Sequence, residues 1–267
     1  MKNGMIGFIG LGNMAKAMIG GMLEKGNVYA GNIIGSARTE QTVKEAAGLL
    51  HIQTTTDNRK VAESAEILFL AVKPQFMADV VSEIRDCITD DILIVSIAAG
   101  KTIEDITAMF GRQIRLIRCM PNTPALVGEG CTGVCRNENV TEEEMSRVMK
   151  LLESFGTASE VREGLIDAVV GVSGSSPAYV FMFIEAMADS AVAAGMPRKQ
   201  AYEFAAQAVL GSAKMVLETG KHPGELKDMV CSPAGTTIEA VKILEEKGFR
   251  GIVMDAVGAC VKKSKEM

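Results

Sequence analysis

The sequence predicts an α/β protein in which a doubly wound parallel sheet is followed by an all-helical C-terminal domain. Short β-branched runs alternate with segments of helical period in the first half, and a glycine-rich turn directly follows the first run. Strand signals then stop near residue 163. Such alternation is typical of βαβ units with helices on both faces of the sheet. The 267 residues allow two domains, which we place at residues 1–162 and 163–267.

The composition excludes several classes of function. Aromatic residues make up 4% and there is no Trp, which disfavours carbohydrate and single-strand nucleic-acid surfaces. The 28 Lys and Arg against 33 Asp and Glu give a charge of −5, and scattered basic residues predict no nucleic-acid partner. Uninterrupted apolar runs fall short of the roughly 20 residues that span a bilayer. We therefore expect no membrane span. We also expect no leader peptide and a cytoplasmic location. The cysteines should be reduced and lie in the core, and no metal site is expected.

The first domain is predicted element by element from hydrophobic runs and helical periodicity. Predicted strands are Met5–Ile9, Asn32–Ser36, Ile67–Val72, Ile92–Ile97, Ile114–Arg118, Cys131–Cys135 and Thr157–Val161. Predicted helices are Met14–Lys25, Thr39–Ala47, Gln75–Cys87, Thr102–Met109 and Thr141–Ser154. Right-handed crossovers would wind these helices around one sheet.

The second domain is predicted to be a series of helices separated by Gly and Pro. Its segment Ala178–Ala194 is apolar around most of its circumference and should be buried on several sides. A thin helical array of this length makes a poor core alone, so we expect packing against a second copy of the chain.

The first strand runs into a G-x-G-x-x-A turn, Gly10 to Ala15, and then into a helix. Gly10 permits the tight turn, Gly12 lets backbone approach a pyrophosphate, and Ala15 keeps the helix close to its strand. Open amides at the helix start would bind phosphate. This context favours a Rossmann-type dinucleotide site over a plain tight turn.

The end of the second strand carries Ser36 and Arg38 where NAD-binding chains place an acidic residue. A hydroxyl and a guanidinium are suited to bind a 2′-phosphate. The sequence therefore favours NADPH as the cofactor, and use of NADH in addition stays open. The alternative is that Arg38 is solvated and Glu40 supplies the acid.

Three further loops follow predicted strands. Pro74 restricts the backbone of Lys73 to an extended conformation. The Lys73 side chain is expected to face either a cofactor phosphate or solvent. Ala98 and Ala99 would let a flat ring pass. Asn122, between two prolines, either presents its amide to nicotinamide or belongs to a plain rigid turn.

Two loops of small residues lie in the second half. One runs from Gly171 to Tyr179, with Pro177 at the first position of a helix. The other runs from Ser232 to Glu239, where Thr236 and Glu239 form a predicted capping box. Open amides at this helix start would bind a substrate carboxylate, and the alternative is an ordinary capped helix.

Together these motifs resemble those of the pyrroline-5-carboxylate reductases over the whole length. The matching segments are GFIGLGNMA, LFLAVKPQ, RCMPNTPA, LIDAVVGVSGSSPAY, HPGELKD and SPAGTTIEAVKILEE. The departures are Ser176, where glycine is more usual, and Met229, where some relatives carry a polar residue.

The resemblance implies reduction of a cyclic imine to proline by NAD(P)H in an interlocked homodimer, which in this family often assembles into decamers. It implies cofactor contacts at Gly10, Leu11, Gly12, Asn13, Met14, Ser36, Arg38, Asn58, Ala71, Val72, Lys73, Pro74, Ala98 and Ala99. It implies that the substrate is held between one subunit's nucleotide domain and the partner subunit's loop 232–237, with substrate contacts at Met120, Glu163, Ser175, Ser232, Gly235, Thr236 and Thr237. We expect the Thr237 hydroxyl to orient or relay the proton to the imine nitrogen.

Two other functions share the N-terminal motif. A β-hydroxyacid dehydrogenase would need a lysine on the helix after Pro177, and Ala178–Ala194 contains none. A non-catalytic NADPH-binding regulator would keep the fold and lack the chemistry. The SPAGTTIEAV loop disfavours that second alternative.

Overall fold

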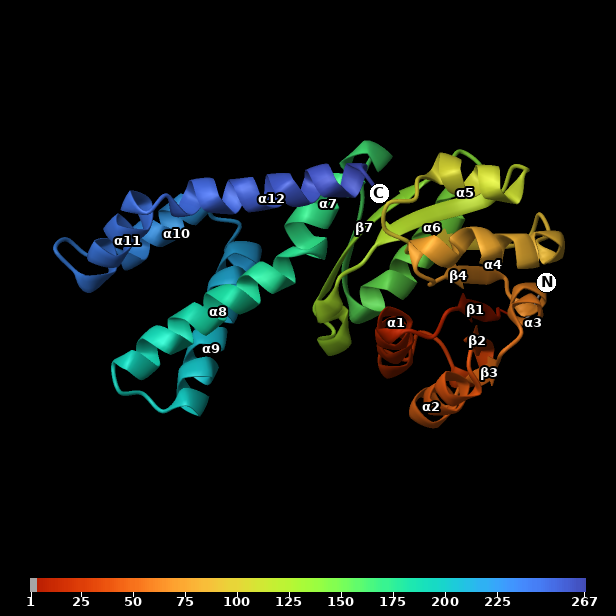
Figure 1. The fold of residues 1–267 in the computed structure, drawn as a ribbon, viewed down its shortest axis with the longest axis horizontal. Coiled ribbons are helices and arrows are strands. Elements are labelled where there is room, and N and C mark those ends of the chain that lie inside the picture. The colour runs from red at the N-terminus through yellow and green to blue at the C-terminus, as the bar shows by residue number, and fades with distance from the viewer. Residues whose placement is uncertain (1–3) are drawn as a thin grey trace. The chain divides into compact units, whose positions relative to one another are not determined.

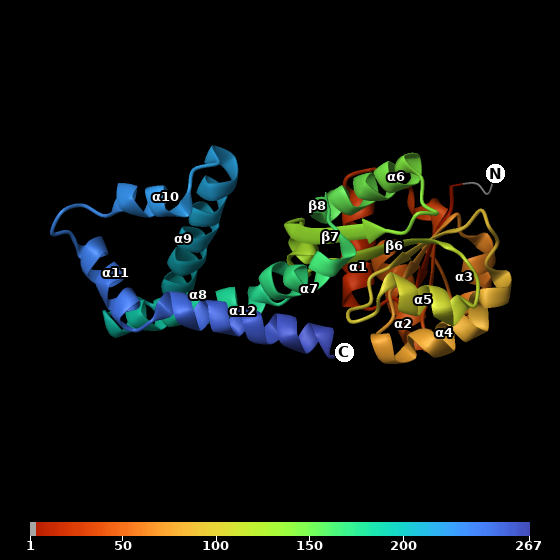
Figure 2. The same cartoon turned by 90° about the horizontal axis from the view of Figure 1, so that it is seen from above.

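The computed structural model describes residues 4–267, which form two compact units. The first unit extends to Ser175 and also contains Cys260–Met267, and the second is Ser176–Ala259. Figures 1 and 2 show a sheet with helices on both faces in the first unit and helices throughout the second. The α/β fold class predicted from the sequence is confirmed.

The first unit contains an eight-stranded sheet in the order β3-β2-β1-β4-β5-β6-β7-β8. Neighbouring strands are parallel except β6 and β7, which are antiparallel. The strands are β1 (Ile6–Ile9), β2 (Ile33–Ser36), β3 (Gln53–Thr55), β4 (Ile67–Leu70), β5 (Leu93–Ser96), β6 (Arg115–Met120), β7 (Gly130–Arg136) and β8 (Gly156–Glu160).

Helices of the first unit cover both faces of this sheet. They are α1 (Asn13–Glu24), α2 (Glu40–Leu50), α3 (Asn58–Ser64), α4 (Met77–Ile84), α5 (Ile103–Phe110), α6 (Glu142–Leu152) and the single turn α7 (Ile166–Val169). Apolar side chains of α1, α2 and α6 form one core cluster with the sheet, and those of α3, α4 and α5 form the other. Near the centre of the first cluster, Phe8 of β1 and Phe69 of β4 stack with ring centroids 4.5 Å apart.

The sequence predicted the long apolar strands to within two residues at most ends, but it missed β3 and α3. β3 has three residues, QTT, none of them buried, at the edge of the sheet. A strand this short and polar has no alternating pattern to detect. α3 has seven residues and begins after Asp57, whose carboxylate accepts hydrogen bonds from the amides of Arg59 and Lys60. This cap was an available signal, because Asp is a preferred N-cap residue.

The second unit consists of helices with a very small core. They are α8 (Ser176–Ala193), α9 (Arg198–Thr219), α10 (Pro223–Val230), α11 (Thr236–Glu246) and α12 (Phe249–Lys265), the last of which ends in the first unit. α8 and α9 form a helical hairpin (Figures 1 and 2). Only Ala188, Ala201 and Ala205 are buried in its apolar cluster.

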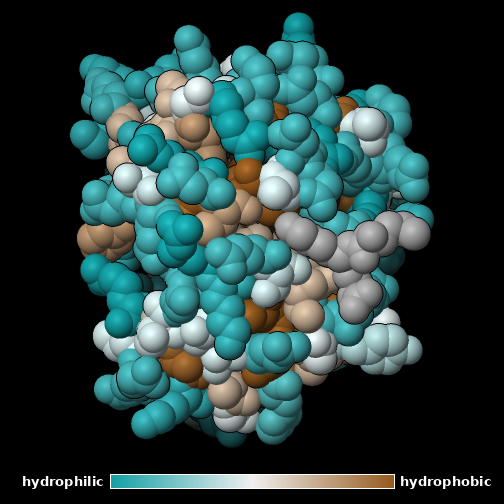
Figure 3. Space-filling model, turned by 90° about the vertical axis from the view of Figure 1, so that its right-hand side faces the viewer, coloured by the Kyte–Doolittle hydropathy of each residue, from teal (hydrophilic) through white to brown (hydrophobic). Residues whose placement is uncertain are grey.

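Large apolar side chains of the second unit are exposed in a single chain. Phe181 is 63% exposed, Met182 69% and Phe204 65%. The prediction that Ala178–Ala194 is buried on several sides is therefore not met within one chain. By contrast, the face of the first unit seen in Figure 3 is mostly hydrophilic. Exposed apolar patches of this kind mark surfaces that contact another protein chain, a membrane or a ligand.

The turn predicted after Gly171 is wrong over its first four residues, which are helical, whereas the helix predicted to open at Pro177 is present and begins one residue earlier. Val170–Gly174 is a π-helical turn, and α8 begins at Ser176, so that Pro177 is its second residue. Among the described residues, one helical stretch, Glu163–Ala193, has the length and composition to cross a membrane. The prediction of no span counted only uninterrupted apolar runs. The apolar faces of this stretch equally suit packing against other helices.

Candidate functional site

The glycine turn after β1 leaves backbone exposed where a phosphate could approach. Gly10 has φ +98°, and a Cβ there would lie 2.5 Å from the carbonyl oxygen of Ala71. Gly12 is the N-cap of α1 without a side-chain cap, and a Cβ there would meet nothing within 4 Å. The first amides of a helix have no partner within the helix. This geometry fits the pyrophosphate of a dinucleotide.

A cavity of about 380 Å³ opens at the carboxyl ends of β1, β2 and β4. In doubly wound sheets ligands bind at this edge. Eight predicted cofactor residues line it, namely Gly10, Leu11, Gly12, Ser36, Arg38, Asn58, Val72 and Lys73. The other predicted cofactor residues, Asn13, Met14, Ala71, Pro74, Ala98, Ala99 and Asn122, do not line this cavity. Glu40 does not line it either, and lies in the first turn of α2.

Two of the residues that line this cavity, Ser36 and Asn58, are linked by a hydrogen bond. The Ser36 hydroxyl donates to Asn58 Oδ1 at 2.7 Å, and Asn58 Nδ2 donates to Glu83 Oε2 at 2.7 Å. Asn58 is the first residue of α3. α3, which was not predicted from the sequence, therefore positions Asn58 beside the cavity. Asn58 was expected to contact the cofactor only because of the family resemblance.

Arg38 lies over the ring of Phe76, with its guanidinium carbon 4.4 Å from the ring centroid. Phe76 also lines the cavity and was missed in the sequence. Within residues 4–267, Arg38 forms neither an ion pair nor a hydrogen bond. Its charged edge is therefore available to an anion.

Glu163 contacts two groups of the first unit through one carboxylate oxygen. Glu163 Oε1 accepts hydrogen bonds from the backbone amide of Ile103 at 2.7 Å and from Arg118 Nη1 at 2.9 Å. Arg118 is 5% exposed. Glu163 thereby neutralises a buried cation and binds the first amide of α5, beside the capping box of Thr102 and Asp105. The two hydrogen bonds from Thr102 hold the pKa of Asp105 below its usual value.

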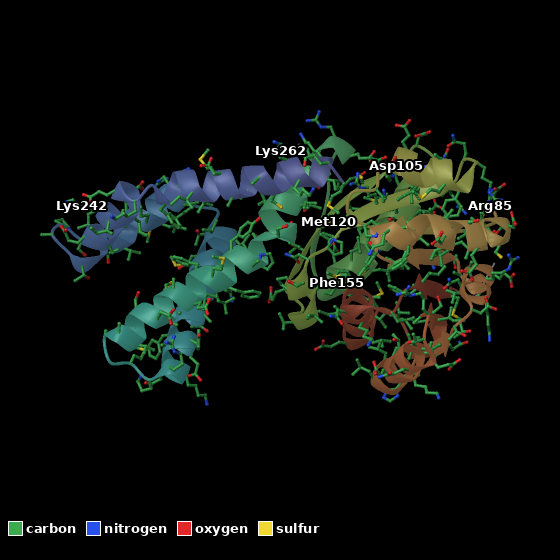
Figure 4. The ribbon with its side chains drawn as sticks, viewed as in Figure 1. Arg85, Asp105, Met120, Phe155, Lys242 and Lys262 are labelled. Carbon is green, nitrogen blue, oxygen red and sulfur yellow. The ribbon has the colours of Figure 1, made fainter. Side chains whose placement is uncertain are left out.

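The carboxyl end of β6 brings three predicted residues into one region. Met120, labelled in Figure 4, ends β6, and its methyl group lies 3.3 Å from the position of a Cβ on Gly174. Asn122 Nδ2 donates to the carbonyl of Ser173 at 2.9 Å, while its Oδ1 accepts from the amide of Cys131 at 2.8 Å. Ser175 accepts a hydrogen bond from the thiol of Cys260. The Asn122 amide thus fixes the loop, and its contact with nicotinamide stays a prediction.

The helix start after Ser232 differs from the prediction. The N-cap of α11 is Gly235, not Thr236, and no side chain caps it, so the predicted capping box is wrong. The amide of Gly235 instead donates to the carbonyl of Ser232 at 3.0 Å in a tight turn. The amides at the start of α11 are consequently unoccupied by side chains. Thr237 lies in this first turn and is half-buried.

Burial makes three of the thiols poor nucleophiles. The described chain has free cysteines only, and Cys87, Cys119 and Cys135 are buried, whereas Cys131 is exposed. Burial raises the pKa of Cys119 and raises the pKa of Cys135 to about 12. No group of three or more His, Cys, Asp or Glu that could bind a metal occurs among the described residues.

Comparisons with known proteins agree with this geometry. Residues 163–267 match the family "Pyrroline-5-carboxylate reductase dimerisation", and residues 5–100 match "NADP oxidoreductase coenzyme F420-dependent". Pyrroline-5-carboxylate reductase of Escherichia coli is 54% identical over 98% of this chain and 97% of its own. The pyrroline-5-carboxylate reductase of Methanosarcina acetivorans is 46% identical over 100% of this chain and 99% of its own length.

Solved structures give the same result. A pyrroline-5-carboxylate reductase from Coxiella burnetii superposes with a TM-score of 0.91 at 35% identity, covering 98% of this chain and 97% of that one. The Plasmodium falciparum pyrroline carboxylate reductase, solved with NADP bound, superposes with a TM-score of 0.89 at 31% identity, covering 100% of this chain and 98% of that one. A prephenate dehydrogenase from A. aeolicus, at 14% identity and a TM-score of 0.56, shares the fold alone. The resemblance seen in the sequence is thus confirmed, and the chain belongs to the pyrroline-5-carboxylate reductase family.

Proposed function

We propose that this chain reduces the C=N bond of 1-pyrroline-5-carboxylate to L-proline with NAD(P)H, the last step of proline biosynthesis. The observation that carries the proposal is the 54% identity with the Escherichia coli reductase over 98% of the chain. The cavity beside the glycine turn supports it, because its backbone amides and Arg38 suit a phosphorylated dinucleotide.

The cofactor, when bound, supplies the hydride, and the first unit binds and orients it. The amides that follow Gly10, as far as Met14, would contact the pyrophosphate, while the amide of Gly10 itself donates to the carbonyl of Ser36 at 3.0 Å. Ser36, Arg38 and Asn58 would contact the ribose and its 2′-phosphate. Ala71 to Pro74, Ala98, Ala99 and Asn122 border the remaining nucleotide. NADPH is preferred over NADH because, within residues 4–267, no carboxylate lines the cavity to repel a 2′-phosphate.

We place the substrate carboxylate at the start of α11 in a second copy of the chain. The amides of Thr236 and Thr237 and the hydroxyls of Ser232, Thr236 and Thr237 are suited to bind it there, beside Gly235, whose own amide donates to the carbonyl of Ser232. Met120, Glu163 and Ser175 complete the substrate contacts. A protonated imine is already a good electrophile, so the protein would mainly have to align the two rings, at the roughly 3–3.5 Å that reacting atoms require, and exclude water. The Thr237 hydroxyl orients or relays the proton at the imine nitrogen, and no stronger acid is required.

The functional protein is an interlocked homodimer, with a decamer as the larger assembly. The apolar side chains that the second unit exposes in one chain support this arrangement. We propose residues 1–162 as the dinucleotide-binding domain and 163–267 as the dimerisation and substrate-binding domain. The enzyme acts in the cytoplasm.

The test follows NADPH absorbance with 1-pyrroline-5-carboxylate and, separately, with 3-hydroxyacids and NADP. Oxidation of NADPH only with the imine supports the proposal. Activity with hydroxyacids would instead indicate a dehydrogenase, and NADPH binding without turnover would indicate a regulator. Either result would refute the proposal.

A matched pair of variants tests Thr237. Thr237→Val keeps the volume and removes the hydroxyl, and we expect turnover to fall tenfold or more with NADPH affinity unchanged. Thr237→Ser keeps the hydroxyl and should retain most activity. Equal rates in the native protein and Thr237→Val would remove the hydroxyl from the mechanism.

A further inference from the structure

The cavity contains an aromatic side chain that the proposed function does not use. Phe76 is the last residue of the 3₁₀ turn Pro74–Phe76, and its amide donates to the carbonyl of Lys73 at 2.9 Å. Pro74 fixes the start of this turn by its restricted φ. The Phe76 ring therefore has a defined place at the edge of the cavity.

Phe76 is the partner of Arg38 in the described chain. The guanidinium carbon lies 4.4 Å from the ring centroid, within the roughly 6 Å range of a favourable cation–π contact. Other arginines around the sheet, such as Arg112 and Arg136, pair with carboxylates. Among the residues that the structure describes, Arg38 has no such pair, so the ring orients the cation without neutralising it.

The surroundings of Arg38 suit a monoanionic or dianionic group on a nucleotide ribose. Ser36 and Asn58 line the same cavity, and neither is charged. A guanidinium lying against a ring keeps its N–H edge free to bind phosphate oxygens in a fork. A solvated arginine would lose rotamer freedom on binding, whereas one already oriented loses less.

We infer that Phe76 is a positioning residue for the 2′-phosphate of the cofactor, acting through Arg38, and thereby sets preference for NADPH over NADH. This inference rests on the proposed function, since it assumes that the cavity binds NAD(P)H. It differs from a general packing role, because packing against adenine would favour both cofactors equally.

The test measures binding, not turnover. Dissociation constants of NADPH, NADH, 2′,5′-ADP and 5′-AMP are determined by calorimetry for the native protein and for Phe76→Leu, which keeps an apolar side chain without the ring. Because Arg38 would then have to be ordered on binding, we expect NADPH and 2′,5′-ADP to bind roughly 2- to 5-fold more weakly to Phe76→Leu, with NADH and 5′-AMP unchanged. Phe76→Tyr should restore the native values.

Two controls isolate the route through Arg38. Tyr29→Leu removes an aromatic ring that is 80% exposed and outside the cavity, and it should change no constant. In an Arg38→Leu background, which itself weakens 2′,5′-ADP binding, adding Phe76→Leu should have no further effect on that ligand.

Equal weakening of phosphorylated and unphosphorylated ligands by Phe76→Leu would overturn the inference, as would unchanged binding of all four. Additive losses in the double variant would also overturn it. Failure of the native protein to bind NADPH would refute the proposed function and the inference together. Native NADPH binding without imine reduction would refute the proposed function alone.

Discussion

Replacing Glu163 tests how far the stability of the first unit depends on one carboxylate. Glu163→Ala removes the acceptor for the Ile103 amide and for the guanidinium of Arg118, which is 5% exposed. A hydrogen bond to a charged group contributes about 1.5–3 kcal/mol, and a helix N-terminal contact about 0.5–2 kcal/mol. Because the Glu163 side chain is 35% exposed, we take the lower values. The expected loss in free energy of unfolding is about 2 kcal/mol.

The assay is urea unfolding followed by circular dichroism at fixed protein concentration, with Glu163→Gln as the matched variant. Glu163→Gln keeps an oxygen acceptor and should lose less than half as much stability as Glu163→Ala. Its KM for the imine, measured far below the unfolding midpoint, reports the proposed substrate contact separately. An unfolding midpoint for Glu163→Ala equal to that of the native protein would refute the structural role assigned to this carboxylate.

Three further predictions concern the same unit. Gly10→Ala places a Cβ 2.5 Å from the Ala71 carbonyl oxygen at φ +98°, so NADPH affinity in a fluorescence titration should fall roughly tenfold or more. The pKa of Asp105 is lower in the folded protein than in the unfolded chain, where it is about 4. The ionised carboxylate therefore stabilises the folded state above about pH 4, and this stabilisation is lost as the pH falls through the pKa of the folded protein. The stability gap between native protein and Asp105→Asn should therefore close on acidification below about pH 4, and a gap constant from pH 7 to 3 would contradict this. Burial that raises the pKa of Cys119 and Cys135 should keep both unlabelled by maleimide until urea unfolds the protein, as judged by mass spectrometry of peptides.

The parts of the fold that the sequence revealed are those with a local signal. The apolar strands β1, β4 and β5 and the turn at Gly10 follow from hydrophobic runs and from the small residues that a tight turn requires. The antiparallel direction of β7 was not predictable, because it depends on pairing with β6 across the sheet and not on composition.

The site shows the same division. Ser36 and Arg38 were found because they lie at the end of a strand, whereas Phe76 carries no motif and gains its proposed role only by proximity to Arg38. At α11 the pattern predicted a cap one residue too late, since Gly235 has the extended backbone of an N-cap without a side chain to signal it.

The small core of the second unit has a consequence for how the protein folds. Three buried alanines provide little transfer free energy against the conformational entropy of five helices. This half should therefore gain its structure together with association, so that refolding from urea includes a bimolecular phase whose rate rises with concentration. Newly made chains would expose these apolar helices until they meet a partner, which makes this interval the period of greatest aggregation risk.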